Sequence, residues 1–170
     1  MRGSLTKIIL FLVISGILFL VFRQENLQGR FKELPSQITD FDALNTDGER
    51  TSFLKEKGEA TLIVLSASWC PACLAEIPVL KKFHQDFSAR GFKILMVSED
   101  DNIKIAKQFK KKYDFPWTVV HWNYDLMNKL GNPSVIPVSY LIRNDGKIET
   151  IKVGDFEESA ILSSIERLLD

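Results

Sequence analysis

The sequence predicts an α/β fold in which helices cover a central sheet, and three observations lead to this class. Residues 61–65 and 92–97 are apolar and rich in β-branched side chains, which is typical of strands buried on both faces. The segments that follow these two runs repeat their apolar residues with the period of a helix. The chain has 170 residues, a length that suits one domain, and strands that alternate with helices favour a layered α/β domain.

Composition excludes several other classes. Apolar residues make up 45% of the chain, so disorder is not its main state. The 22 basic and 22 acidic residues give a net charge of zero and no reason to expect a nucleic-acid partner. With only two cysteines, a scaffold held by several disulfides is also excluded.

The first 22 residues predict a membrane anchor. Residues 8–22 carry no charge and follow Arg2 and Lys7, and a run of about 15 residues is near the short limit for a spanning helix. A cleaved signal peptide is the alternative, but the run ends in bulky residues and not in a small-residue cleavage site. The closest flanking charges favour a cytoplasmic N-terminus, which places the remainder of a single-pass protein in the periplasm or at the cell exterior. We therefore expect a cytoplasmic segment at residues 1–7, a transmembrane anchor at 8–22, a polar linker at 23–37 and a folded domain at 38–170.

The folded domain is expected to begin with a β-hairpin and to continue as alternating strands and helices. Asp47-Gly48 is a turn sequence between two short strand candidates. Strands are expected at residues 41–44, 50–53, 61–65, 92–97, 117–122, 138–142 and 147–153. Helices are expected from Pro71 to a stop at Gly91, and at residues 103–113, 125–130 and 157–169.

The two cysteines, Cys70 and Cys73, lie where the strand at residues 61–65 leads into a helix. Pro71 fits the first helical turn, because its missing N–H would have no partner there, and this leaves Cys70 at or near the N-cap. Free backbone N–H groups and the helix dipole favour a thiolate at that position. We predict that Cys70 attacks a substrate disulfide and that Cys73, one turn later and more buried, resolves the mixed disulfide.

Half of a zinc site and an inert structural pair are the other interpretations of a Cys-x-x-Cys sequence. A zinc site with four protein ligands needs further partners, and the only two histidines, His84 and His121, are not part of a Cys/His cluster. We therefore expect no metal and no organic cofactor, and the redox group is expected to be the Cys70–Cys73 disulfide.

The strand, the cysteine pair and the residues around them resemble the thioredoxin superfamily, and more narrowly its membrane-tethered TlpA/ResA/DsbE (CcmG) group. Trp69-Cys70-Pro71-Ala72-Cys73 is similar to the WCxxC motif, Glu76 and Pro78 to the E-x-P that follows it, and Ile136-Pro137 to the cis-proline loop. The resemblance runs from about residue 41 to the C-terminus. It implies a thioredoxin-like fold, with a central mixed sheet flanked by helices, an N-terminal hairpin and a helix–strand insertion at about residues 100–122.

The resemblance also implies roles for residues near the cysteines. Trp69 and Pro71 are expected to support the active site, and the backbone of Ile136 is expected to pair with an incoming substrate strand beside a cis Pro137. An ordinary trans bond at Pro137 is the alternative, since most X-Pro bonds are trans. Pro133 is a weaker candidate for the same place.

The chain departs from thioredoxin beneath the cysteine pair. Val64 stands where thioredoxin has a buried aspartate, six residues before the first cysteine, and Ser66 stands where an aromatic residue is usual. Proton transfer from Cys73 therefore needs another base, and Glu76 is the candidate. The alternative is that Glu76 only complements the positive end of the helix dipole.

As a function, the resemblance implies a thiol–disulfide oxidoreductase that reduces selected protein disulfides in the periplasm, for example in apocytochrome c or at copper-site thiols, with electrons from a membrane donor. A disulfide oxidase or isomerase is an alternative, because a proline directly after the first cysteine also occurs in oxidising relatives. A non-catalytic thioredoxin-like module that binds metal or thiols is another, although its copper-binding representatives have a longer cysteine spacing. A peroxidase of the peroxiredoxin type is disfavoured, because residues 66–69 lack a threonine.

Overall fold

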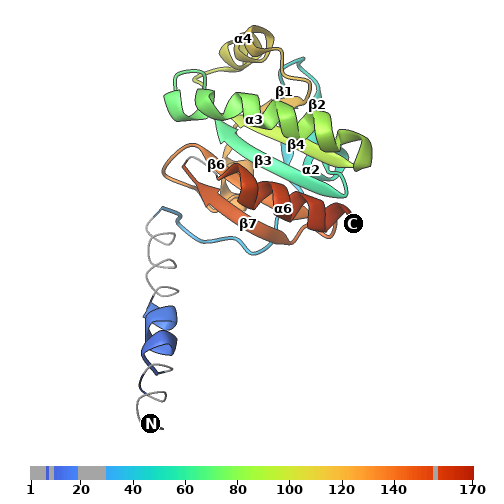
Figure 1. The fold of residues 1–170 in the computed structure, drawn as a ribbon. Coiled ribbons are helices and arrows are strands. Elements are labelled where there is room, and N and C mark those ends of the chain that lie inside the picture. The colour runs from blue at the N-terminus through green and yellow to red at the C-terminus, as the bar shows by residue number, and fades with distance from the viewer. Residues whose placement is uncertain (1–6, 8–9, 19–29, 155–156) are drawn as a thin grey trace.

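The computed structural model describes residues 7, 10–18, 30–154 and 157–170. A seven-stranded mixed sheet forms the centre of the domain, and helices cover both of its faces (Figure 1). The strand order is β2-β1-β5-β4-β3-β6-β7. The predicted α/β architecture is therefore confirmed.

The strands that carry the site lie at the middle of this sheet. The strands are β1 (Asp42–Asn45), β2 (Arg50–Ser52), β3 (Ala60–Ser66), β4 (Phe92–Ser98), β5 (Thr118–His121), β6 (Val138–Arg143) and β7 (Ile148–Val153). β3, β4 and β5 are parallel neighbours, whereas β6 pairs with β3 and β1 pairs with β5 in the antiparallel sense. The C-terminal ends of the three parallel strands thus meet at one edge of the sheet, which we call the active edge.

The helices follow the predicted order with two local differences. They are α2 (Phe53–Glu56), α3 (Pro71–Phe87), α4 (Ile103–Tyr113), α5 (Tyr124–Lys129) and α6 (Glu158–Leu169), with a 3-10 turn at Ser88–Arg90. Phe53 begins a helix, and does not end the second strand as expected, because the Ser52 side chain caps it by accepting a hydrogen bond from the Lys55 backbone N–H. The long helix α3 ends at Phe87, and the chain then turns at Gly91, whose positive φ of 92° favours glycine.

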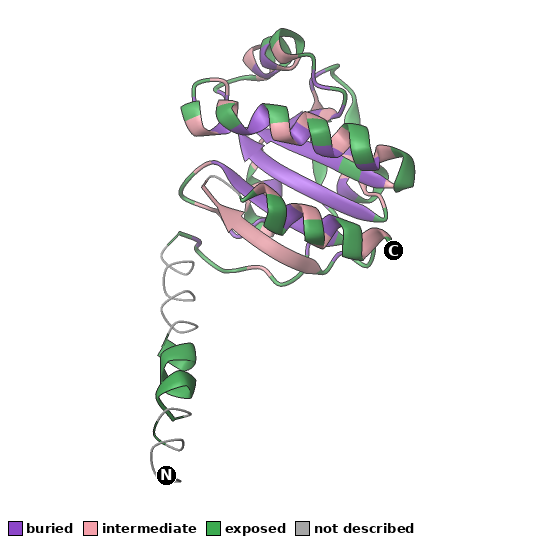
Figure 2. Cartoon of the chain, viewed as in Figure 1, coloured by how far each residue is buried: buried purple, intermediate pink, exposed green. Residues whose placement is uncertain are grey.

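Two hydrophobic clusters pack on the two faces of the sheet. In β3 the side chains alternate, so that Leu62 and Val64 join one cluster while Ile63 and Leu65 join the other. Residues from α3, α4 and α6 complete the first cluster, whereas α2, α5 and the segment before β1 complete the second. Figure 2 shows the central strands as a buried layer beneath helices α3 and α6, which present their exposed residues to solvent. This burial explains the apolar composition of β3 and of β4 beyond its exposed Lys93.

The C-terminal part of the predicted linker belongs to the folded domain. Phe31 is buried, and its ring meets the Tyr140 ring edge to face at 6.3 Å. The Lys32 N–H donates to the Gly131 carbonyl, and the Ser134 N–H donates to the Arg30 carbonyl. The folded domain therefore begins before residue 38, because a few apolar residues without a regular period in a polar segment did not indicate that the segment packs on the domain.

The N-terminal segment is only partly described. Residues 10–18 are helical and their apolar side chains are exposed (Figure 2). Within the described ranges, no helix combines the length and the apolar character needed to cross a bilayer. Most of the predicted cytoplasmic segment, both ends of the predicted anchor and residues 23–29 of the predicted linker lie outside the described residues.

Candidate active site

Cys70 and Cys73 form a disulfide at the N-terminus of α3, on the active edge. Cys70 is the N-cap residue, as predicted, and its Sγ accepts a hydrogen bond from the Cys73 backbone N–H at 3.2 Å. Cys70 is 5% exposed and Cys73 is 2% exposed, so the resolving candidate is the more buried of two enclosed sulfurs. After reduction, the same N–H and the helix dipole are placed to stabilise a thiolate on Cys70.

The local sequence explains this geometry. Pro71 occupies the first turn of α3, where a missing N–H costs nothing. The Cys70 N–H donates to the Ala67 carbonyl at 3.2 Å, which closes the turn between β3 and α3. Trp69 in this turn is 62% exposed, so it presents a large aromatic surface beside the disulfide.

The cis-proline loop lies against the cysteines. The Ile136–Pro137 peptide bond is cis, as the resemblance implies. Ile136 packs against the small cluster formed by Ala67, Cys70 and Cys73. The structure therefore brings the two predicted parts of the site together although they are more than 60 residues apart in the sequence.

Glu76 is buried within α3, one turn after Cys73, with only 6% of its surface exposed. A glutamate that only complements the helix dipole can stay exposed to solvent. The burial of Glu76 is therefore not explained by that alternative. Val64 packs in the first hydrophobic cluster and Ser66 is buried, so no carboxylate occupies the thioredoxin position. A role for Glu76 in proton transfer stays a prediction, and its burial is compatible with it.

A buried hydrogen-bond network around Asp100 was not anticipated from the sequence. Asp100 is fully buried after β4, and its carboxylate accepts bonds from the Ser68 N–H at 3.1 Å, the Ser68 hydroxyl at 2.7 Å and the Ser98 hydroxyl at 2.7 Å. Its own carbonyl oxygen lies 2.8 Å from Nε2 of His121. Because Ser68 is two residues before Cys70, this network fixes the loop that carries the disulfide to β4. The signal was present: Glu99-Asp100-Asp101 directly follows a buried parallel strand.

Glu99 is a second acidic residue at the same edge. Burial raises its pKa from 4.5 to about 6, since it penalises the charged form. The folded state therefore holds this proton more tightly than the unfolded chain does. As pH rises from about 4.5 to about 6 and the proton is lost, the free energy of unfolding falls.

We therefore expect Glu99→Gln to be free of the loss of stability that the native chain undergoes when Glu99 ionises. Its free energy of unfolding should exceed that of the native chain by up to about 1 kcal/mol at pH 7, a value reduced to allow for the partial exposure of the side chain. The difference should vanish near pH 4, where the native carboxyl is protonated. Urea unfolding at both pH values measures it, and a difference that is the same at both would contradict the assignment.

The two histidines lie apart from the disulfide chemistry. His84 in α3 stacks edge to face with Trp117 at 5.9 Å, and burial lowers its pKa. His121 is bonded to the Asp100 backbone. Within the described residues, no group of three His, Cys, Asp or Glu side chains is placed to hold a metal ion.

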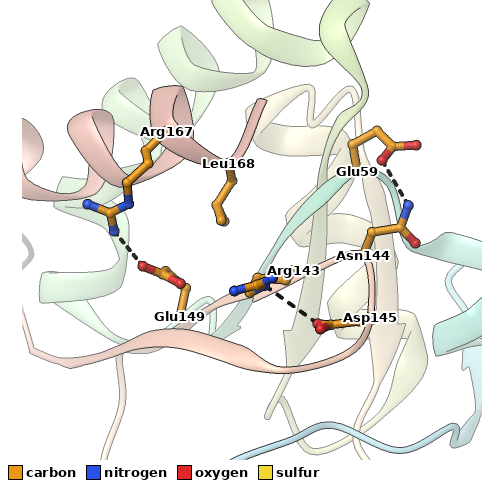
Figure 3. A pocket seen from close by; sticks show the side chains of 7 residues that line it. All are labelled: Glu59, Arg143, Asn144, Asp145, Glu149, Arg167 and Leu168. Carbon is orange, nitrogen blue, oxygen red and sulfur yellow. Dashed lines mark hydrogen bonds and ion pairs between the residues drawn. The ribbon is translucent and has the colours of Figure 1, made fainter. Parts of the chain in front are cut away.

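A hollow of about 520 Å³ lies at the opposite edge of the sheet, near the start of β3 and the end of β6 (Figure 3). Its charged residues are already paired with one another: Arg167 with Glu149, Arg143 with Asp145, and Asn144 with Glu59 (Figure 3). This hollow lies at the end of β3 opposite to the disulfide, both of its arginines are held in ion pairs, and Glu59 accepts a hydrogen bond from Asn144. It is therefore not the active site.

Comparison with known proteins gives relatives of one kind. The thiol-disulfide oxidoreductase ResA of Oceanobacillus iheyensis is 23% identical over 150 residues, which cover 86% of this chain and 78% of that protein. A solved structure described as the thiol:disulfide interchange protein DsbE of Chlorobium tepidum superposes with a TM-score of 0.72 at 22% identity, over 81% of this chain and 99% of that one. StoA of Bacillus subtilis superposes with a TM-score of 0.62 at 25% identity, over 76% of this chain and 98% of that one.

The predicted thioredoxin-like fold is thus confirmed by the solved structures. The model of the redoxin family matches residues 33–169, which begins within the segment that packs on the domain and ends at the last residue of α6. This match covers most of the chain and includes both cysteines and the cis-proline loop. The chain belongs to the redoxin family and, with its Cys70–Cys73 pair, is a thiol–disulfide oxidoreductase.

Proposed function

We propose that this chain reduces selected disulfides of extracytoplasmic proteins and is itself reduced by a membrane electron donor. The observation that carries the proposal is the Cys70–Cys73 disulfide at the N-terminus of α3, packed against Ile136 beside the cis Pro137. Relatives named thiol-disulfide oxidoreductase support the reaction class. Apocytochrome c thiols and copper-site thiols are the substrates that we propose for testing.

The reaction uses the two sulfurs in turn. The Cys70 thiolate attacks a sulfur of the substrate disulfide, so that one S–S bond breaks while a mixed disulfide forms and the released substrate sulfur takes up a proton. Cys73 then loses its proton and attacks Cys70, which restores the Cys70–Cys73 disulfide and releases the second substrate thiol. Two electrons have passed to the substrate, and we propose Glu76 as the group that accepts the Cys73 proton.

The reducing direction is argued from charge. A very stable Cys70 thiolate would favour the dithiol form and make the protein an oxidant. Glu76 places a carboxylate one turn from Cys73, which disfavours additional negative charge there. The first lysines after the pair, Lys81 and Lys82, are two or more helical turns beyond Cys73, and Lys82 is held by Glu158 at 2.6 Å. The helix N-terminus is therefore the main support for the thiolate, and we expect only a moderately lowered thiol pKa.

We expect a reduction potential below that of glutathione. Equilibration of the soluble domain with glutathione buffers, followed by quantification of the free thiols, measures this potential. A value near −120 mV, which is typical of a strong periplasmic oxidant, would instead support the oxidase alternative suggested by Pro71. An isomerase would lie between these limits and would rescue scrambled disulfides in a refolding assay.

The N-terminal segment is proposed as an uncleaved anchor that places the domain at the outer side of the cytoplasmic membrane. Leu10, Phe11, Leu12, Ile14 and Leu18 are all more than half exposed in the described helical residues, which is typical of a helix that faces lipid. The mass of the protein extracted from membranes should include residues 1–22. A mature N-terminus beyond Phe22 would identify the segment as a cleaved signal peptide.

A further inference from the structure

A pocket of about 390 Å³ opens on the active edge. We call it the acidic–aromatic pocket, and it is lined by Glu99, Asp101, Trp122, Tyr124, Met127 and Asn132. These residues come from the loop after β4, the end of β5, helix α5 and the loop that leads to the cis-proline. They therefore follow the same ends of the parallel strands as Cys70 does.

One carboxylate oxygen among the residues that line the pocket has no hydrogen-bond partner. Oε1 of Glu99 is buried and accepts no hydrogen bond. Among the ion pairs of the described residues, none includes Glu99 or Asp101. A buried carboxylate oxygen without a donor is costly, so the pocket is complementary to a group that brings both positive charge and N–H donors.

The aromatic walls favour the same kind of group. Trp122 and Tyr124 meet edge to face at 5.6 Å, and Tyr124 is 80% exposed. Exposed indole and phenol faces attract ammonium and guanidinium groups. Met127 offers a flexible apolar surface for an alkyl stem. A long side chain with a cationic end satisfies all three surfaces, whereas a free metal ion would use only the carboxylates.

Hydrogen bonds join the pocket to the loop that carries the disulfide. The Glu99 N–H donates to the Ser66 carbonyl at 2.9 Å, and the neighbouring Asp100 accepts two bonds from Ser68, so the loop that carries Glu99 is bonded to the loop that carries Cys70. A substrate segment that reaches the disulfide therefore lies on the same side of the sheet as the pocket. Its disulfide and a side chain a few residues away can be engaged at the same time.

We propose that the acidic–aromatic pocket binds a lysine or arginine side chain of the substrate polypeptide, close in sequence to the disulfide that is reduced. This proposal rests on the proposed function, since it names a feature of the substrate of the same site. It assigns Glu99 as a specificity residue that touches the substrate and takes no part in electron transfer.

The test compares disulfide peptides that differ in one side chain. Each peptide contains one intramolecular disulfide and a lysine at one of the three positions on either side, and its partner has uncharged norleucine at that position. At one or more positions we expect the reduced protein to act on the lysine peptide with a kcat/KM about five times higher than on its partner. In Glu99→Gln this preference should fall to about one.

Glu166→Gln is the matched control. It removes the same charge from an exposed position on α6, which covers the other face of the sheet, and should keep the full preference for lysine. Equal loss in both variants would show that only the overall charge matters, and no preference at any position would overturn the proposal.

A second measurement does not depend on turnover. The oxidised protein is titrated with a lysine peptide that lacks cysteine, and the indole N–H signal of Trp122 is followed by NMR. We expect it to shift with the lysine peptide and not with the norleucine peptide. If the signal shifts but no peptide is reduced, the proposed function is wrong and the binding of a cationic side chain in the pocket is supported. If peptides are reduced without the shift and without the preference for lysine, the proposed function is supported and the proposal for the pocket is wrong.

Discussion

Cys70→Ser is expected to abolish disulfide reduction, whereas Cys73→Ala should still attack its substrate and then stop at the mixed disulfide. Cys70 is the N-cap of α3 and its sulfur already accepts the Cys73 N–H, so the attacking thiolate is stabilised only there. A hydroxyl is not ionised at neutral pH, and we expect the rate of insulin reduction by Cys70→Ser to fall by at least about 1,000-fold. In the native host, Cys73→Ala should accumulate covalent adducts whose partners identify the substrates.

The two variants serve as controls for each other, because each removes one buried sulfur from the same turn. Circular dichroism should show that both are folded. Alkylation of the reduced native domain should also modify Cys70 much faster than Cys73. A Cys70→Ser protein that forms substrate adducts through Cys73 would reverse the assignment.

Asp100→Ala should cause the largest loss of stability among the substitutions considered for the active edge. It would leave the Ser68 N–H and two serine hydroxyls without their acceptor in a fully buried position. We expect the free energy of unfolding to fall by about 3 kcal/mol, since each buried polar group left unpaired costs roughly 1–3 kcal/mol and some regain water. Urea unfolding measures this loss.

Two further variants define what the loss means. Asp100→Asn retains an acceptor oxygen and should lose about half as much stability as Asp100→Ala. Asp86→Ala removes an exposed carboxylate from the surface of α3 and should change stability by less than about 0.5 kcal/mol. Equal effects of Asp100→Ala and Asp86→Ala would mean that the network contributes little to folding.

Local patterns were sufficient to predict most of the fold. The buried strands β3 and β4 are rich in apolar residues. Cys70 and Pro71 mark the beginning of α3, and Gly91 marks the turn that follows its end. These signals act within a few residues, so the sequence displays them directly. The disulfide pair and the cis-proline loop were also found, because their residue types are rare and their spacing is specific.

Features that depend on contacts between distant segments were missed. Phe31 packs on Tyr140 more than 100 residues later, and nothing around Phe31 distinguishes it from an exposed residue of a linker. Asp100 acts on Ser68 because β3 and β4 are parallel neighbours, which is a property of the sheet and not of either segment. Glu99 likewise becomes partly buried only in the folded chain, where it lines a pocket together with residues of α5.

The docking of residues 30–37 on the domain sets an upper limit on the distance between the domain and the proposed anchor. The docked segment bonds to Gly131 and Ser134, in the same loop that leads to Ile136. If residues 8–22 span the membrane, seven residues separate the span from Arg30, and even fully extended they reach no more than about 25 Å. The docked segment and the loop to which it bonds would then stay close to the lipid headgroups. Such a short tether would favour disulfides in membrane-bound or newly translocated chains over those of freely diffusing proteins.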